Sequence, residues 1–351
     1  EKKIREFKPE EYWDISFTGS KNSQPINFSL SRKKSDPLLK EEEAKHIESL
    51  ILNSDLKISE VIKKPTNSKP RPPFITSTLQ QAASTRLGFS VSRTMRAAQK
   101  LYENGLITYM RTDAPSLSKE SILDARAYIE KNFGDAYLTN APRIYSSKEN
   151  AQEAHEAIRP TNAHVTVAHI HDQKDDERKL YEIIWEQFIA CQLPDADFLS
   201  TSVFIEFEAY QFQAKGREIL FDGFLKVYKQ KESDEDQQLP SLTSGDLLEF
   251  DSHKLDKKFT KPPARFSEAA LVKELEKKGI GRPSTYANII STIRDRGYAA
   301  IINRRFFVNK IGMIVSDRLL ENFDDIMDYN FTASFENRLD DIANGQANWL
   351  E

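Results

Sequence analysis

The sequence predicts a mixed multidomain fold of α and β elements, in which a discontinuous β-rich domain holds one helical domain between its halves and a second helical domain follows. Alternating apolar and polar residues, typical of half-buried strands, run through the first 68 residues and return at about residue 196. Elsewhere the apolar period is helical, and 351 residues suffice for two or three domains. We therefore expect β-rich halves at 1–68 and 196–265, and helical domains at 69–195 and 266–351.

The composition is that of an ordinary globular chain, with 39% hydrophobic and 30% charged residues. No apolar run approaches the roughly 18 residues of a membrane span, so we expect a cytoplasmic protein without membrane contact. The single Cys191 excludes an internal disulfide and a cysteine-based zinc site. With 50 basic and 54 acidic residues, any surface for a polyanion must be local. The chain does not begin with Met, and we expect it to be a piece of a longer protein.

The first β-rich half is predicted to contain two strands and a helix. Residues 12–17 and 26–30 alternate as strands, with a turn expected at 19–22. A charged helix is expected over 40–52. The segment 63–73 is rich in proline and small polar residues, which predicts a stiff linker or hinge and the first domain boundary.

Helical periodicity begins after this linker. A capping box opens a helix over 77–88, and a second helix covers 92–105. Residues 106–110 are β-prone and predict a short strand. Further helices are expected from residue 118 onward and over 180–191.

Strands return over 203–209 and 219–228. A helix is then expected over 267–279, and a second one, over 285–296, is capped by the serine before it. Residues 298–308 read as a hairpin with an Asn-Arg turn, and one or two helices finish the chain.

The two helix pairs form an internal repeat. Residues 77–88 match 267–279, and 92–105 match 284–297, with an apolar strand expected after each pair. This is the outline of a winged-helix or helix-turn-helix module, which commonly contacts nucleic acid. Basic residues lie near the exposed turn or second helix of both copies: Arg93, Arg96, Lys100, Arg282, Arg294, Arg296, Arg304 and Arg305.

Tyr109 and Arg111 are the first candidate catalytic residues. Because side chains on a strand alternate, both would lie on one face, with Met110 toward a core. A phenol oxygen can attack a phosphodiester as a nucleophile, and the planar guanidinium can hold two phosphate oxygens.

His155 is the third candidate. The run 150–160 begins like a capping box, and the proline at its end limits any helix to a short one. His155 can gain a charge near neutral pH, and we expect it and Arg159 to contact phosphate. No second His or carboxylate has metal-ligand spacing to His155, so no metal site is expected here.

The run 279–286 is a candidate phosphate seat, because two glycines expose backbone just before a helix N-terminus. The spacing is not that of a nucleotide-hydrolysing loop. We expect Arg282, Ser284, Thr285 and Arg296 to contact a DNA backbone.

Three runs, 107–113, 151–160 and 259–298, closely resemble the bacterial type IA DNA topoisomerases, and the resemblance spans the whole chain. It implies a torus in which a β-rich arch joins two helical, winged-helix-like domains. It also implies that Tyr109 attacks one DNA strand and becomes linked to its 5′ phosphate. By the same resemblance, Arg111 steadies that phosphate and His155 assists.

The chain departs from this family in one important respect. Family members carry an N-terminal Toprim domain whose acidic cluster binds Mg²⁺, and C-terminal DNA-binding domains, and neither is recognisable here. The resemblance thus implies Mg²⁺ in the intact enzyme, with ligands absent from this chain. The expected partners are single-stranded segments of underwound DNA and the protein's own missing domains. We expect the chain alone to bind single-stranded DNA weakly and not to relax supercoils.

Other interpretations fit less of the sequence. A tyrosine recombinase would carry its tyrosine after a His-x-x-Arg motif, whereas Tyr109 precedes His155 here. A non-catalytic winged-helix DNA-binding protein explains the repeat but not the pairing of Tyr109 with Arg111. A topoisomerase III or reverse gyrase lies within the same class, and the run 152–160 favours a topoisomerase I.

Overall fold

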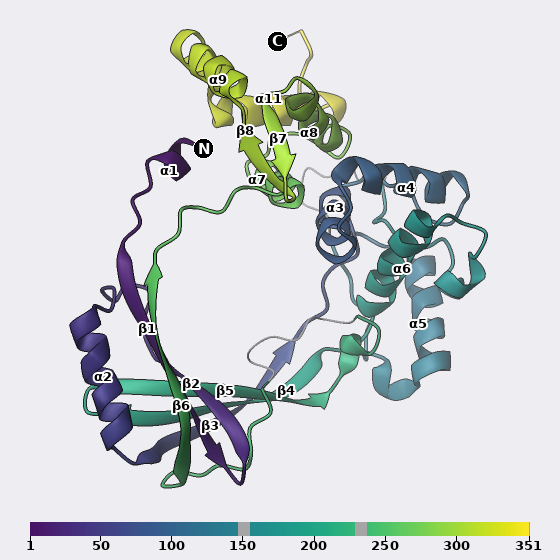
Figure 1. The fold of residues 1–351 in the computed structure, drawn as a ribbon. Coiled ribbons are helices and arrows are strands. Elements are labelled where there is room, and N and C mark those ends of the chain that lie inside the picture. The colour runs from purple at the N-terminus through teal and green to yellow at the C-terminus, as the bar shows by residue number, and fades with distance from the viewer. Residues whose placement is uncertain (147–154, 229–236, 351) are drawn as a thin grey trace.

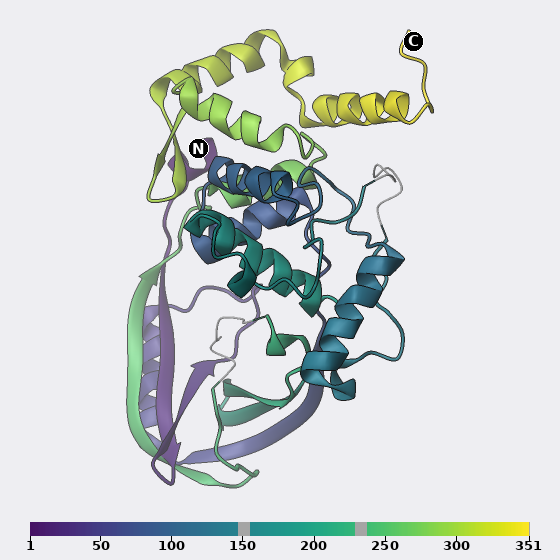
Figure 2. The ribbon, with the colours of Figure 1, turned by 90° about the vertical axis from the view of Figure 1, so that its right-hand side faces the viewer.

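The helices and strands are arranged in a ring (Figure 1), as seen in the computed structural model, which describes residues 1–146, 155–228 and 237–350. A β-barrel forms one end of the ring, helices form the opposite end and one side, and extended chain leading from β1 and β6 completes the other side. Figure 2 shows the C-terminal helices at the end of the molecule farthest from the barrel. The chain starts with a single helical turn, α1 (Lys2–Arg5), on the same side as those helices.

The barrel is assembled from both β-rich halves of the sequence. Its strands close in the order β1-β2-β5-β4-β3-β6, and every pairing is antiparallel. The strands are β1 (Glu11–Lys21), β2 (Gln24–Leu30), β3 (Leu56–Ser68), β4 (Ala196–Phe207), β5 (Tyr210–Phe221) and β6 (Leu247–Phe259). Helix α2 (Glu41–Asn53) packs on β1, and the stacked rings of Phe17 and Phe28, 4.9 Å apart, lie in the core.

Two predictions in the first half are wrong in position. The turn lies at Asn22–Ser23, not 19–22, because these two residues adopt the positive φ that a tight hairpin needs. The linker is shorter than 63–73, since β3 continues to Ser68. Proline is tolerated there because, among the described residues, this part of β3 pairs only with β4 and so has an open edge.

The strand prediction for 219–228 is also wrong beyond Phe221. Residues Gly223–Lys226 form the 3₁₀ turn η4. Gly223 has a φ of 48°, and a Cβ there would lie 2.1 Å from the carbonyl oxygen of Asp195. The chain therefore turns tightly against residues 194–195, directly before β4, instead of continuing as a strand.

The helices between the barrel halves agree with the predicted pattern, with shifted starts. They are α3 (Thr76–Ala82), the π-helical η1 (Ala83–Leu87), α4 (Val91–Glu103), α5 (Lys119–Phe133), η2 (Asp135–Tyr137), η3 (Val167–His169) and α6 (Asp175–Ala190). Ser118 caps α5 as expected. The first two helices start one residue before the expected 77 and 92, because Ile75 is the N-cap of α3 and Ser90, which accepts the N–H of Arg93, is the N-cap of α4.

The expected strand at 106–110 is absent, and only Ile107 forms a single bridge, to Pro160. The expected short helix over 150–158 is wrong for its described part, and residues 147–154 lie outside the described residues. Both segments bond to remote backbone: Ile158 N donates to Phe74 O (2.7 Å) and Thr108 N to Arg159 O (2.9 Å).

The C-terminal region contains α7 (Glu268–Lys277), α8 (Tyr286–Asp295), the hairpin of β7 (Ala299–Ile302) and β8 (Arg305–Val308), and the helices α9 (Lys310–Asn322), α10 (Asp324–Met327) and α11 (Tyr329–Ala343). The predicted Asn303–Arg304 turn is confirmed, with both residues at positive φ. The N-cap of α8 is Thr285, one residue later than expected. A hairpin follows the second helix pair only, so the winged-helix assignment stays a prediction. Across the described residues no helix is long and apolar enough to cross a membrane.

Candidate active site

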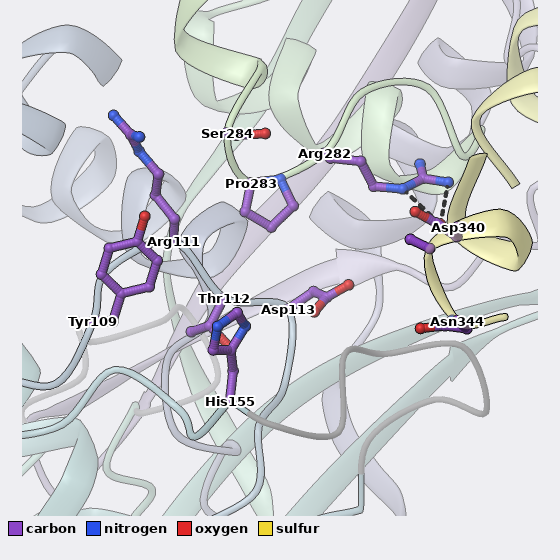
Figure 3. Close-up of a pocket in the computed structure, with 11 residues that line it drawn as sticks. Tyr109, Arg111, Thr112, Asp113, His155, Arg282, Pro283, Ser284, Asp340 and Asn344 are labelled. Carbon is purple, nitrogen blue, oxygen red and sulfur yellow. Dashed lines mark hydrogen bonds and ion pairs between the residues drawn. The ribbon is translucent and has the colours of Figure 1, made fainter.

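A cavity of about 290 Å³ lies where the tyrosine-bearing segment meets the loop before α8 (Figure 3). Its lining comes from four separate parts of the chain: Tyr109, Arg111, Thr112, Asp113, His155, Arg282, Pro283, Ser284, Asp340, Ala343 and Asn344. Five of the eight site residues predicted from the sequence are among them. Residues up to 235 positions apart thus meet in one place, as 344 − 109 = 235.

The segment that carries Tyr109 is fixed by α3 and by its own buried residues. The hydroxyl of Thr76 donates to the carbonyl oxygens of Met110 (2.8 Å) and Thr112 (3.0 Å), and it accepts the N–H of Thr112 (2.9 Å). Met110 is 1% exposed. Tyr109 and Arg111 therefore face the cavity together, as the sequence predicts, although the segment is not a strand.

The Tyr109 ring is half-buried between two other rings. The ring of Tyr102 lies edge-on at 5.3 Å and that of His155 is tilted at 5.9 Å. The phenol oxygen has no hydrogen-bond partner within the described part of the chain, and Figure 3 shows it on the side where Arg111 extends. These contacts hold the ring but leave its oxygen available to a ligand.

The side chains of Arg111 and His155 are also without polar partners among the described residues. Among residues 1–146, 155–228 and 237–350, neither side chain has a hydrogen bond or an ion pair, and Arg111 is exposed. An unpaired guanidinium beside a free phenol is suited to an anionic ligand. Asp113 and Asp340 also line the cavity, so its charge is mixed.

Arg282, in contrast, is hydrogen-bonded through all three nitrogens. Nε and Nη2 donate to Oδ2 of Asp340 (2.9 and 2.7 Å), and Nη1 donates to the carbonyls of Gly279 (3.1 Å) and Gly281 (2.9 Å). Burial disfavours the charged form of Arg282, but the Asp340 carboxylate more than offsets this and raises the pKa of the guanidinium.

The expected phosphate seat is occupied by protein groups. The N–H of Gly281 donates to Oε1 of Glu336 (3.1 Å), and the N–H of Arg282 donates to the hydroxyl of Thr285 (2.8 Å). Glu336 lies on α11, so carboxylates of that helix take the place that the sequence assigns to phosphate. Ser284 is exposed, and its hydroxyl has no partner in the described residues.

Arg159 and Arg296 do not line the cavity. Nε of Arg159 donates to Glu156 (2.7 Å) and Nη1 to the carbonyl of Pro160 (3.0 Å), and its side chain is 14% exposed. Arg296 is exposed at the C-terminus of α8. Four further residues of the site were not predicted: Tyr102, Asp113, Asp340 and Asn344. Asp113 ends the run 107–113, but no local pattern distinguishes the other three.

A metal site was not expected at these residues. Over the described ranges, no group of three or more His, Cys, Asp or Glu side chains could hold a metal ion.

The chain is similar to DNA topoisomerases along its whole length. A family model described as DNA topoisomerase matches residues 1–351. DNA topoisomerase 1 of Vibrio cholerae is 51% identical over 99% of this chain and 40% of the relative, and that of Escherichia coli is 49% identical over 99% and 41%. The chain thus spans about two fifths of the length of these curated relatives.

Its fold is similar to a solved one. The structure of full-length topoisomerase I from Thermotoga maritima matches with a TM-score of 0.85 at 33% identity, over 98% of this chain and 57% of the other. The ring of Figure 1 is therefore part of a larger known architecture.

Proposed function

The chain belongs to the family of bacterial type IA DNA topoisomerases, and we propose that the whole protein cuts and reseals one DNA strand through Tyr109. One observation supports this most strongly. Tyr109, Arg111 and His155 line one cavity, and within the described residues their side chains have no hydrogen bond or ion pair.

The proposed reaction is a transesterification. The phenol oxygen of Tyr109 forms a bond to a phosphorus of one strand, while the bond from that phosphorus to the 3′ oxygen breaks. The phenol proton is lost and the departing oxygen gains one, leaving a 5′-phosphotyrosine and a 3′-hydroxyl. The reverse reaction reseals the strand, and no ATP is needed because the bond energy is conserved.

Arg111 and His155 assist in this proposal. The Arg111 fork can hold two oxygens of the scissile phosphate and offset the charge that develops on them. His155 lies beside the tyrosine ring, where it can donate to the same phosphate. A free phenol has a pKa near ~10, so these two residues give only part of the activation.

The proposed DNA contacts are of two kinds. Ser284 and Arg296 have side chains without described partners and can meet the backbone directly. Arg159, Arg282 and Thr285 each have an internal partner, which a phosphate would have to replace.

Passage of the second strand through the cut would change the linking number by one and relax negative supercoils. Mg²⁺ would act in the intact enzyme, and its ligands would come from outside this chain. We place the enzyme with the DNA in the bacterial cytoplasm. We also keep as a proposal the division into a β-rich arch (1–68 and 196–265), a tyrosine-bearing domain (69–195) and a second DNA-binding domain (266–351).

Capture of the covalent adduct tests this proposal. The chain is mixed with the separately produced N-terminal region of the same protein, Mg²⁺ and a labelled single-stranded oligonucleotide, and the protein is then denatured. We expect a labelled protein band that Tyr109→Phe abolishes and Tyr102→Phe preserves, because Tyr102 is the adjacent ring. An adduct that survives in Tyr109→Phe would refute the assignment.

The chain alone gives a second test. We expect it to bind the oligonucleotide, with or without the Tyr109 hydroxyl, and to leave supercoiled plasmid unrelaxed with or without Mg²⁺. Efficient relaxation by the chain alone would contradict the need for further domains. Binding without any adduct, even with the N-terminal region present, would favour a non-catalytic DNA-binding protein.

A further inference from the structure

The two helical regions meet in a small interface beside the cavity. Helix α3 packs on α7 and α4 packs on α8. Val91, the first residue of α4, is 0% exposed and lies in a cluster whose other buried members all belong to the C-terminal region: Val272, Tyr286, Ile290, Ala299 and Phe306. A single core side chain of the tyrosine-bearing region therefore enters this cluster.

Glu268 makes a charged contact at the same point. It is the first residue of α7 and only 9% exposed, and its Oε2 accepts the N–H of Val91 at 2.6 Å. The first N–H groups of a helix have no partner within it, and that end carries partial positive charge. Ser90 satisfies the N–H of Arg93, and Glu268 satisfies that of Val91. One carboxylate thus joins the N-termini of α7 and α4.

A positive charge, that of Arg304, lies at the other end of the turn between η1 and α4. Arg304, at the tip of the β7–β8 hairpin, lies so close to Gly88 that a Cβ there would be 3.0 Å from its Nη2. Gly88 ends η1 in the left-handed conformation, and a helix C-terminus carries partial negative charge. The C-terminal region therefore holds the turn between η1 and α4 with an acid at one helix end and a base at the other.

Two buried polar side chains lie on the helix that packs on α7. Ser77 and Gln80 are buried on α3, and the Ser77 hydroxyl and both amide atoms of Gln80 have no partner in the described residues. A buried polar group without a partner costs free energy. An interface that contains a buried carboxylate and one core side chain of the tyrosine-bearing region suits a contact that opens.

We propose that Glu268 is the latch of this interface, a positioning residue whose bond to Val91 sets how readily the tyrosine-bearing region parts from the C-terminal region. The proposal rests on the proposed function, in which the ring must open for a strand to pass. Tyr109 and Arg111 lie on one side of the interface, and Arg282 and Ser284 on the other. Release of the latch would therefore open the cavity and separate its two walls.

Distance measurement between spin labels tests the latch without any DNA chemistry. Cysteines are placed at the exposed positions Leu123 on α5 and Ile311 on α9, one on each side of the interface. Cys191 is fully buried, and burial raises the pKa of its thiol to about 12, so it should stay unlabelled. We expect the parent chain to show one main distance and a minor population at a longer distance. That population should increase when Glu268 is replaced.

Three variants give the outcome. Glu268→Ala should increase the longer-distance population about tenfold, or ~1.4 kcal/mol. Glu268→Gln keeps an acceptor without the charge and should fall between Glu268→Ala and the parent. Glu274→Gln, on the same helix with an ion pair to Lys278, should match the parent. If Glu268→Ala does not fold, Glu268→Gln alone tests the latch, and its longer-distance population should then exceed that of the parent chain. If the Glu268 variants give the same distance distribution as Glu274→Gln, the latch is wrong. This holds whether or not the adduct experiment succeeds.

Discussion

The two walls of the cavity carry similar cations that differ in what they contact. On the wall of residues 109–113, Arg111 and Tyr109 have no hydrogen-bond partner among the described residues. On the wall of residues 279–285, Arg282 is bonded to Asp340 and to two carbonyls, and the Gly281 N–H is bonded to Glu336. A guanidinium without hydrogen bonds can bind an anionic ligand directly. A guanidinium whose nitrogens all donate to protein groups stabilises the structure, and it can bind a ligand only after one of those bonds breaks. The difference predicts that Arg111 binds phosphate directly, whereas Arg282 first holds the protein's own structure, although the sequence led us to expect phosphate contact from both.

Removal of Arg111 should give the largest effect. Arg111→Ala loses the guanidinium that offsets phosphate charge, and we expect adduct formation to fall by about 10²–10³-fold. Arg111→Lys keeps the charge but not the planar pair of donors, so its rate of adduct formation should lie between those of Arg111→Ala and the parent. The rate of adduct formation in the mixture with the N-terminal region measures this. Arg318→Ala, an exposed arginine of α9 outside the cavity, is the control, and an equal loss there would mean that Arg111 acts through general charge and not through a phosphate contact.

Removal of Arg282 should act on structure first. Arg282→Ala leaves Asp340 without its cation and frees α11 from the loop, which we expect to cost about 1–3 kcal/mol locally. Hydrogen exchange should become faster in α11 (Tyr329–Ala343) and stay unchanged in the barrel strands. Unaltered protection of α11, together with a loss of DNA binding, would mean that Arg282 is a direct DNA contact and that the two walls are alike.

Asp340→Asn should have a smaller effect in the opposite direction. Without the carboxylate, Arg282 can turn to a phosphate, and we expect single-stranded DNA to bind several-fold more tightly. One added phosphate contact should also steepen the salt dependence of log K by about 0.7. Fluorescence anisotropy over a range of salt concentrations measures both. Asp341→Asn, one residue along the same helix, removes the same charge elsewhere, and an equal gain there would indicate general electrostatics.

Arg159 should matter least. It lies outside the cavity, and its mostly buried side chain pairs with Glu156, so Arg159→Gln should lower the free energy of unfolding by about 1 kcal/mol. We expect DNA affinity to fall by only about twofold, because a phosphate would have to displace Glu156 before it could bind Arg159. Chemical denaturation and the same anisotropy assay check this. An unchanged affinity would remove Arg159 from the proposed DNA contacts.

Local sequence patterns predicted the facing of Tyr109 and Arg111 correctly, because Met110 between them is apolar enough to be buried. They did not predict that protein groups accept hydrogen bonds from all three nitrogens of Arg282. Its carboxylate partner lies 58 residues away on a helix whose position no local pattern determines. The expected strand at 106–110 failed for the same reason, since its backbone bonds to residues 159–161 rather than to a neighbouring hairpin.

Most helices and strands followed from apolar periodicity, but their starts depended on finer chemistry. Ser90 and Ser92 are both acceptable N-caps by residue type, and the structure uses Ser90, which places Val91 in the interface with α7 and α8. A shift of two residues would have turned a different side chain inward and removed the contact to Glu268. The cap therefore fixes the contact on which the proposed latch depends, and periodicity alone could not predict it.

The pairing of Ser68 with Ala196 has a mechanical consequence. The chain enters and leaves the tyrosine-bearing region through adjacent ends of β3 and β4. Helices α5 and α6 of that region share a hydrophobic core with Phe198 of β4 and Phe224 of η4, and Tyr137 donates to Asp222. A rotation of the region on the barrel would therefore have to deform this shared core as well as the two strands, so the joint resists bending more than two strands alone would.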